Sequence, residues 1–251
     1  MRQRMEHDEL KQASHRTIDV LLGGFFGRSN RGFLGWSGIY LVTTPSGRRL
    51  IFDTGGYNER GTIPKLLEER GLDATAIDCV VLSHLHFDHG ANWDLFPKAD
   101  LVVHEKEIAY AQVTNDTAIL RYHAPALLAN NRLRLIREES STLENGVQVV
   151  HVPGHTPGAI ALTIEDSVLS GDALKSRWDL RGELTDTWND ELAMQSIQKI
   201  AGLGNRIYPG HDVPLERRGS DWFPCGTPSV RLLFPDGSEQ SIQPRSRRKD
   251  V

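Results

Sequence analysis

Four side chains of the types that bind metal ions fall within positions 84–89, in the run His-Leu-His-Phe-Asp-His. Residues i and i+2 of an extended chain point to the same side, so His84 and His86 can reach one ion. Asp88 and His89 follow where the chain turns, and their side chains can address a second ion beside the first. Imidazole and carboxylate suit zinc, although iron, manganese or nickel accept much the same ligands. The run therefore predicts a paired metal site.

Three later segments share one pattern, a strand-like run that ends in glycine or proline next to a residue able to bind metal. His155 lies in Val-Pro-Gly-His-Thr-Pro-Gly, Asp172 follows Leu-Ser-Gly, and His211 follows Tyr-Pro-Gly. Glycine beside each of them lets the backbone turn sharply and approach an ion closely. These three residues are therefore candidates to complete the site.

Most of these candidate residues are expected to follow β-strands. We expect strands at 39–43, 49–52, 79–83, 101–103, 147–152, 159–164 and 167–169. Thr62 is expected to cap a helix with its body at 65–70, and a second helix is expected from 189 to about 201. Pro-Asp-Gly at 235–237 predicts a hairpin turn. This order fits a layered α/β architecture without deciding its topology.

Taken in order from residue 53 to residue 211, these motifs resemble those of the metallo-β-lactamase superfamily. The resemblance implies a four-layer αββα sandwich with two metal ions, expected to be Zn²⁺ with iron or manganese as alternatives, at the open edge between two sheets. Carried over by position, the expected ligands are His84, His86 and His155 for the first metal, Asp88, His89 and His211 for the second, and Asp172 bridging both. Asp53 would support the ligand histidines from behind.

The chemistry that the resemblance implies is metal-dependent hydrolysis. Two ions roughly 3.5–4 Å apart can generate a metal-bound hydroxide that attacks an activated carbonyl, such as that of a lactone or an ester. Asp88 is placed both to bind metal and to move the proton. Asp172 stands where one group of secreted β-lactamases carries cysteine, so antibiotic hydrolysis is not the expected task.

The motifs also look like those of the quorum-quenching lactonases, which usually place a tyrosine shortly after the bridging aspartate. Here Asp172 is followed by Ala-Leu-Lys. Lys175 is therefore a candidate catalytic residue, which would either make an electrophilic contact with the substrate or bind a substrate carboxylate. The alternative is an ordinary solvated surface lysine.

Other residues are weaker candidates for contact with substrate. One or two of the five tryptophans, at 36, 93, 178, 188 and 222, are expected to line an apolar pocket for an acyl group, and the glycine-rich segment 23–27 is a candidate loop over the site. His104, His123 and His151 are expected to be packed or exposed outside the metal site.

Length and composition bound the remaining possibilities. The 251 residues are expected to form one domain, with a flexible lead at 1–16 and a flexible basic tail at 244–251. No apolar run approaches the roughly 20 residues of a membrane span, and no secretory signal opens the chain, so a cytoplasmic protein is expected. The net charge of −4, with scattered basic residues, argues against nucleic acid binding. A small acyl compound is the expected partner, and a homodimer remains open.

Several other activities are compatible with the same ligand set. A thioester hydrolase of the glyoxalase II type is one, although the short chain after His211 reads as a hairpin and tail rather than a helical glutathione-binding extension. An iron-dependent oxidoreductase is another, since these ligands also accept iron. A phosphodiesterase fits less well with the acidic net charge. A protein that binds metal only for stability is the non-catalytic alternative.

Overall fold

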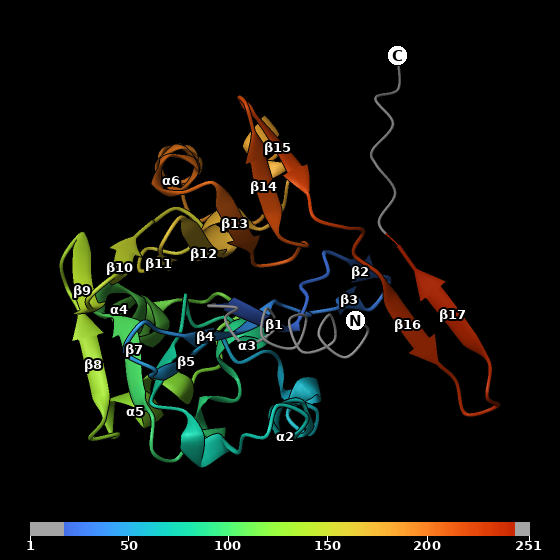
Figure 1. Cartoon of the computed structure of the whole chain (residues 1–251), viewed down its shortest axis with the longest axis horizontal. Coiled ribbons are helices and arrows are strands. Elements are labelled where there is room, and N and C mark those ends of the chain that lie inside the picture. Colours follow the sequence, from blue (N-terminus) through green and yellow to red (C-terminus); the bar gives the residue numbers. More distant parts are fainter. Residues whose placement is uncertain (1–17, 244–251) are drawn as a thin grey trace, which may run out of the picture.

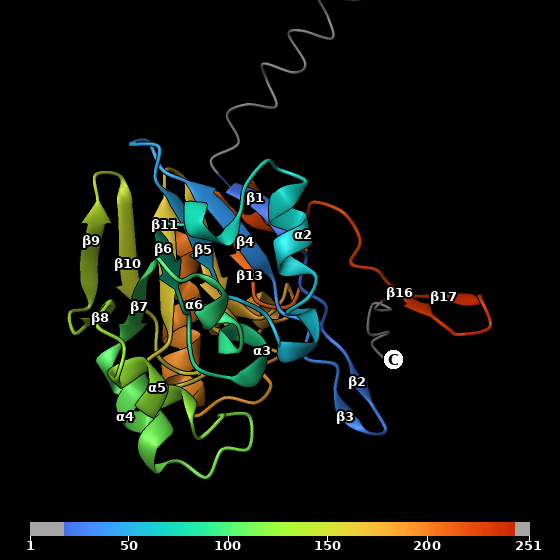
Figure 2. The ribbon, with the colours of Figure 1, turned by 90° about the horizontal axis from the view of Figure 1, so that it is seen from below.

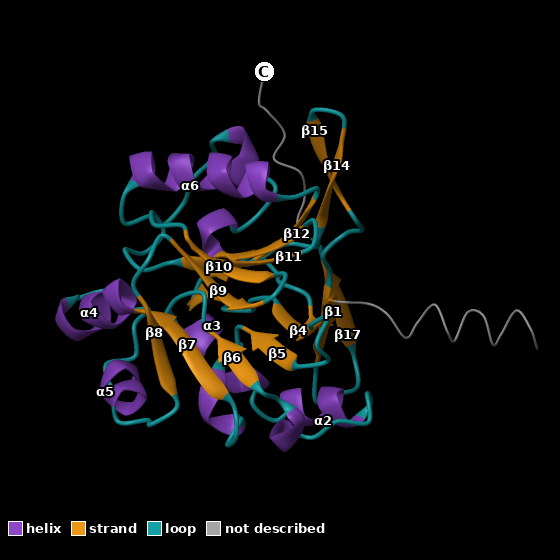
Figure 3. Cartoon of the chain, turned by 60° about the vertical axis from the view of Figure 1, so that its left-hand side comes forward, coloured by secondary structure: helices purple, strands orange, loops and turns teal. Residues whose placement is uncertain are grey.

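Two mixed β-sheets packed face to face form the centre of the computed structural model, which describes residues 18–243. Helices cover the outer side of each sheet, α6 on one side and α2, α4 and α5 on the other (Figures 1 and 3). This is the four-layer αββα sandwich that the sequence predicted. The lead and the basic tail that were predicted to be flexible lie outside the described residues.

The first sheet has six strands in the order β1-β4-β5-β6-β7-β8. Their bounds are Ile18–Leu22, Ile39–Thr43, Arg49–Phe52, Cys79–Val81, Asp100–His104 and Leu133–Ile136. β4 pairs antiparallel with β1 and β5, and β5 to β8 run parallel. Parallel neighbours need crossover connections, which contain α2 (Ile63–Glu68), α3 (Phe87–Gly90), α4 (Glu105–Val113) and α5 (His123–Leu128).

The second sheet has seven strands in the order β15-β14-β13-β12-β11-β10-β9. Their bounds are Asp221–Pro224, Leu215–Arg218, Arg206–Pro209, Ser167–Gly171, Ile160–Ile164, Val147–His151 and Ser140–Glu144. Only β12 and β13 pair in parallel, and α6 (Asp190–Leu203) makes their crossover. Asn189 caps α6 by accepting a hydrogen bond from the N–H of Leu192.

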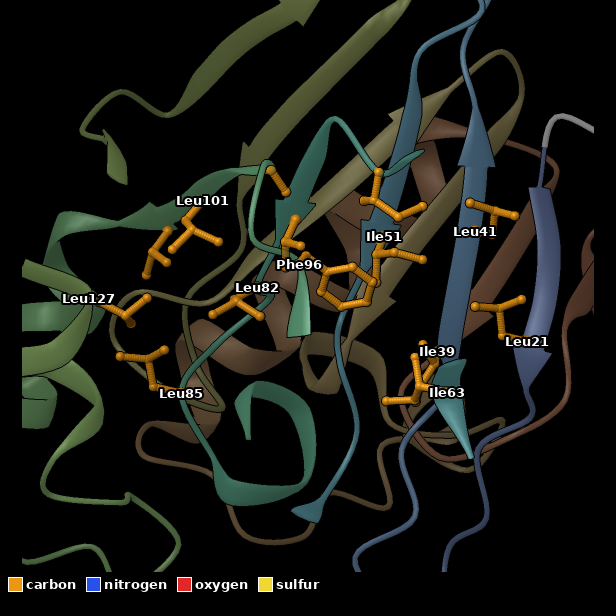
Figure 4. Close-up of a cluster of buried hydrophobic side chains, with 14 of the residues drawn as sticks. Leu21, Ile39, Leu41, Ile51, Ile63, Leu82, Leu85, Phe96, Leu101 and Leu127 are labelled. Atoms are coloured by element: carbon orange, nitrogen blue, oxygen red, sulfur yellow. The ribbon is translucent and has the colours of Figure 1, made fainter. Parts of the chain in front are cut away.

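Three apolar layers hold the four layers of secondary structure together. Along β5, Ile51 packs outward against the helices, whereas Leu50 and Phe52 pack inward between the sheets, as the two-residue period of a strand requires. Figure 4 shows the outer layer, where Ile63 of α2 and Leu127 of α5 meet side chains of the first sheet. The third layer lies between the second sheet and α6.

Most predicted elements are present, with shifted ends. β6 ends at Val81, two residues earlier than predicted, because the N–H of Ser83 bonds the carboxylate of Asp53 instead of a strand. The capping prediction for Thr62 was wrong, because its backbone is already helical, unlike that of a typical capping residue, and its side chain makes no capping hydrogen bond.

Two small hairpins stand away from the body of the molecule (Figure 2). One is β2 (Arg28–Ser29) with β3 (Gly32–Phe33), near the site described below. The other is β16 (Val230–Leu233) with β17 (Glu239–Ile242), and it confirms the turn predicted at 235–237. No helix within residues 18–243 is long and apolar enough to cross a membrane.

Candidate metal centre

The seven residues predicted to bind metal all follow strands that end at one edge of the sandwich. Phe52 of β5 pairs with Val81 of β6, so Asp53 and the segment 82–89 leave the first sheet together. In the second sheet β10, β12 and β13 run in one direction, since β11 is antiparallel to both β10 and β12. The loops after these three strands therefore carry the candidates of the second sheet, His155, Asp172 and His211, to the same edge.

The structure brings these seven residues together in three overlapping groups. The groups are His84, His86 and His155; His84, His89 and Asp172; and Asp88, His89 and His211, each with ligand atoms within 4.8 Å of one another. The first and third groups are the two triads predicted for the first and second metals. The middle group shares His84 with the first and His89 with the third, and it adds Asp172.

Asp172 faces both triads, one oxygen to each. Its Oδ2 lies 3.4 Å from Nε2 of His155, whereas its Oδ1 lies 3.2 Å from Nε2 of His89 and 3.3 Å from Nε2 of His211. Within the triads, Nδ1 of His86 lies 3.0 Å from Nε2 of His155, and Nε2 of His211 lies 3.4 Å from Oδ2 of Asp88. This is the placement expected of a carboxylate that bridges two ions.

Each of the five histidines bonds the surrounding protein through one ring nitrogen and turns the other toward the centre. The outward bonds run from His89 to the carboxylate of Asp53 and from His86 to that of Asp116, from His155 and His211 to the carbonyls of Asp186 and Trp36, and from His84 to the Ser83 hydroxyl. A ring that donates its outer N–H has a lone pair on the inner nitrogen. Histidines that bind metal are held in this way.

Two polar atoms at the centre have no hydrogen-bond partner, although both are buried. They are Nε2 of His84 and Oδ1 of Asp172. A buried polar atom without a partner is costly, so such atoms are rare unless a ligand or an ion satisfies them. Burial also lowers the pKa of His84 and of His155 well below the usual range, which keeps both rings neutral, the form that binds metal. The donor set thus fits a pair of divalent cations.

Asp53 lies directly behind the cluster, in a strained backbone conformation. Its φ is 58°, in the left-handed region that few residues other than glycine adopt. The carboxylate accepts hydrogen bonds from the N–H and the hydroxyl of Ser83 at 2.7 and 2.8 Å, and it lies 2.7 Å from Nδ1 of His89. It therefore ties the start of the 84–89 segment to one of the candidate ligands.

A pocket of about 360 Å³ opens beside the cluster. Six of its lining residues are aromatic, namely Phe25, Phe26, Phe33, Phe87, Tyr110 and Trp188. Trp188 is thus the one predicted tryptophan in this lining. From the glycine-rich segment 23–27, Phe25, Phe26 and Gly27 line the pocket.

Lys175 also lines this pocket, and it is only 5% exposed. Its Nζ donates a hydrogen bond to the carbonyl of Thr185 at 2.8 Å and lies 3.9 Å from Oδ2 of Asp172. The alternative of a solvated surface lysine is therefore wrong. Its ammonium group stands within reach of a molecule bound in the pocket.

The family model described as the metallo-beta-lactamase superfamily matches residues 37–211, well over half of the chain. The chain belongs to the metallo-beta-lactamase superfamily. An N-acyl homoserine lactonase of a Bacillus species is 29% identical over 176 residues, which cover 66% of this chain and 68% of that relative. This membership and the lactonase relative place the chain among the metallo-hydrolases.

Solved structures of other proteins have the same fold. A protein of Thermotoga maritima described as a metallo-beta-lactamase superposes with a TM-score of 0.65 at 21% identity, over 80% of this chain and 98% of that one. A dizinc quorum-quenching lactonase in complex with its product superposes with a TM-score of 0.59 at 23% identity, over 76% of this chain and 79% of that one.

Sequence reasoning missed several residues around this metallo-beta-lactamase centre. Asp116 lies 3.0 Å from the outer nitrogen of His86, but it comes from a loop in which no sequence motif marks it as a site residue. The carbonyl of Asp186 holds His155, and the Asp186 carboxylate pairs with Arg28 of the β2–β3 hairpin at 2.6 Å. These contacts join segments 30 or more positions apart, which no local pattern reveals.

The histidines expected to lie outside the site are packed elsewhere. His104 stacks on His151 with ring centroids 4.2 Å apart, and His151 lies 3.1 Å from a carboxylate oxygen of Glu139. His123 is buried in α5. None of the three belongs to a candidate metal group among the described residues.

Proposed function

We propose that the chain is a dinuclear metal-dependent hydrolase that opens a lactone or a related carboxylic ester. The observation that carries the proposal is the direction of the histidine nitrogens, because five rings are fixed by outward bonds and turn their inner nitrogens toward one shared centre. Lone pairs that converge in a buried space without donors to meet them destabilise a fold. A pair of cations would satisfy them.

The residues proposed to hold the ions are those predicted from the sequence. His84, His86 and His155 would hold the first, Asp88, His89 and His211 the second, and Asp172 both. Nitrogen and oxygen donors suit zinc, and iron or manganese are the alternatives. Bound there, two such ions would supply Lewis acidity toward a carbonyl oxygen and would lower the pKa of water.

The chain's own residues would orient the substrate and move the proton. Lys175 would donate a hydrogen bond from Nζ to the carbonyl oxygen of the substrate and oppose the negative charge that develops there. The Asp88 carboxylate would accept the proton that the attacking water loses. It would return this proton to the ring oxygen of the lactone as the carbon–oxygen bond breaks, so that a hydroxy acid is released.

The pocket supports a substrate with an apolar acyl group. Its aromatic lining residues, such as Phe26 and Trp188, offer apolar surface next to the cluster. The Bacillus relative is an N-acyl homoserine lactonase, whose name combines an acyl chain with a lactone. N-acylated and simple lactones are therefore the first substrates to test.

The test is a hydrolysis panel run on protein of measured metal content. Lactones should be hydrolysed faster than thioesters, β-lactams and phosphodiesters, by protein that contains about two metal ions per chain. His84→Ala should lose metal and activity together. His104→Ala, which changes a buried histidine outside the cluster, should keep both. Wild-type protein that binds no stoichiometric zinc, iron or manganese would refute the proposal.

A further inference from the structure

Glu107, in the first turn of α4, is a fully buried carboxylate that neither the proposed metal binding nor the proposed proton transfer uses. A buried carboxyl group is costly unless it is hydrogen-bonded. Burial raises the pKa of Glu107, in keeping with that cost. The hydrogen bonds of Glu107 therefore have to offset the cost of its burial, and they indicate its role.

Both oxygens of Glu107 accept hydrogen bonds from backbone N–H groups of the candidate metal centre. Oε1 accepts from Leu85 at 3.0 Å, and Leu85 stands between His84 and His86. Oε2 accepts from Gly158 at 3.1 Å, three residues after His155. One carboxylate thus holds the two loops that supply the entire first triad.

These two loops belong to different halves of the molecule. The loop of His84 follows β6 in the first sheet, and the loop of His155 follows β10 in the second sheet. α4 also packs directly on the second loop, since a Cβ atom at Gly158 would lie 2.1 Å from the backbone nitrogen of Glu107. Glu107 therefore connects a loop of the first sheet to a loop of the second sheet, at the place where the residues of the first triad meet.

We propose that Glu107 is a positioning residue that sets the distance between the two loops of the first triad before any ion binds. This inference rests on the proposed function. Each carboxylate oxygen accepts a hydrogen bond from one loop, so a side chain with a single acceptor oxygen cannot hold both loops. The second triad has other supports, namely Asp53 behind His89 and the carbonyl of Trp36 on His211. Loss of Glu107 should therefore weaken one metal site and spare the other.

The variant Glu107→Gln tests this, because glutamine keeps the shape but replaces one acceptor by an NH₂ group. Glu105→Gln is the matched control, since Glu105 lies in the same helical turn but pairs with Arg137 at the surface. Zinc affinity is measured by competition with a chromogenic chelator. In a His211→Ala background, where the first triad remains intact, Glu107→Gln should weaken zinc binding about 10- to 100-fold, and Glu105→Gln should leave it unchanged.

The reciprocal background separates positioning from a general loss of structure. In His86→Ala protein, where the second triad remains intact, Glu107→Gln should leave zinc affinity unchanged. An equal loss in both backgrounds, or no loss in either, would overturn the proposal while leaving the proposed function intact. Wild-type protein that binds no zinc would overturn both.

A measurement on the wild-type protein covers the case in which Glu107→Gln does not fold. The N–H groups of Leu85 and Gly158 should remain protected from hydrogen exchange after all metal has been removed, because Glu107 rather than an ion holds them. If both groups exchange as fast as exposed loop amides in the metal-free protein, the loops are not preset and the proposal is wrong.

Discussion

Replacement of Gly210 by alanine should disable the centre by steric displacement alone. Gly210 immediately precedes His211, and a Cβ atom there would lie 2.0 Å from Oδ1 of Asp172. Ordinary contacts begin at 3.4 Å, so the carboxylate or the loop must move by the difference, about 1.4 Å. Gly210 has no left-handed backbone conformation, so the added methyl group brings no backbone strain of its own.

The size of the effect follows from that displacement. A misplacement of about 1 Å in a catalytic arrangement can cost about 100-fold in rate, or about 2.7 kcal/mol of transition-state stabilisation. We therefore expect Gly210→Ala to lower kcat/KM for a lactone at least about 100-fold and to weaken metal binding. Overpacking should also reduce the free energy of unfolding by about 1–3 kcal/mol.

The same substitution at Gly202 is the control. Gly202 lies near the end of α6 with no atom within 4 Å of an added Cβ, so alanine there should raise stability by about 0.5–1 kcal/mol and leave activity unchanged. Zinc content, urea unfolding and lactone hydrolysis are measured for both variants. Wild-type turnover and two tightly bound ions in Gly210→Ala would refute the role assigned to Asp172.

Four further predictions concern single groups or the metal itself. Asp53→Asn should weaken zinc binding about 10- to 100-fold, because one donor that faces Asp53 then meets an NH₂ group; unchanged affinity would contradict this. Lys175→Met should lower kcat/KM for lactones about 100-fold at constant metal content, and a wild-type rate would exclude the contact with the substrate carbonyl. Burial raises the pKa of Asp179 from 3.8 to about 6, so the free energy of unfolding falls as the pH rises from 3.8 to about 6. Urea unfolding is measured in the presence of a chelator. Between pH 4 and pH 7.5, the free energy of unfolding of Asp179→Asn should rise by about 2–3 kcal/mol relative to that of the wild type; a difference between the two proteins that does not depend on pH would refute this. Removal of metal should lower the melting temperature, since each ion at 100 times its Kd contributes about 2.7 kcal/mol; an unchanged melting temperature would argue against metal in the folded protein.

Local sequence predicted most of the strands, because alternating or continuous apolar residues between turn signals define strands over short distances. β4 and β5 have their predicted bounds. The ends of other elements shifted where a side chain from elsewhere competes for the backbone. The clearest case is Ser83, whose N–H bonds Asp53, thirty positions earlier, and so ends β6.

The candidate ligands could be read from the sequence because each sits in a short pattern of its own. His84 to His89 form one run, and His155, Asp172 and His211 each follow a strand that ends in glycine or proline. The supporting residues have no such pattern. Glu107 accepts a hydrogen bond from the N–H of Leu85, 22 positions away. Asp116 and the Asp186 carbonyl contact His86 and His155, 30 and 31 positions away.

The types and order of the candidate ligands, and the strands that carry them, follow from the amino-acid sequence alone, because these depend on side-chain chemistry and on neighbours along the chain. The burial of Lys175 beside Asp172, and the orientation of Asp172 with one oxygen toward each triad, follow instead from the packing of the folded chain. The same packing places a carboxylate of α4 between the loops of the two sheets. These features arise where the two sheets pack together, and the distances across that packing depend on the whole core rather than on any one segment.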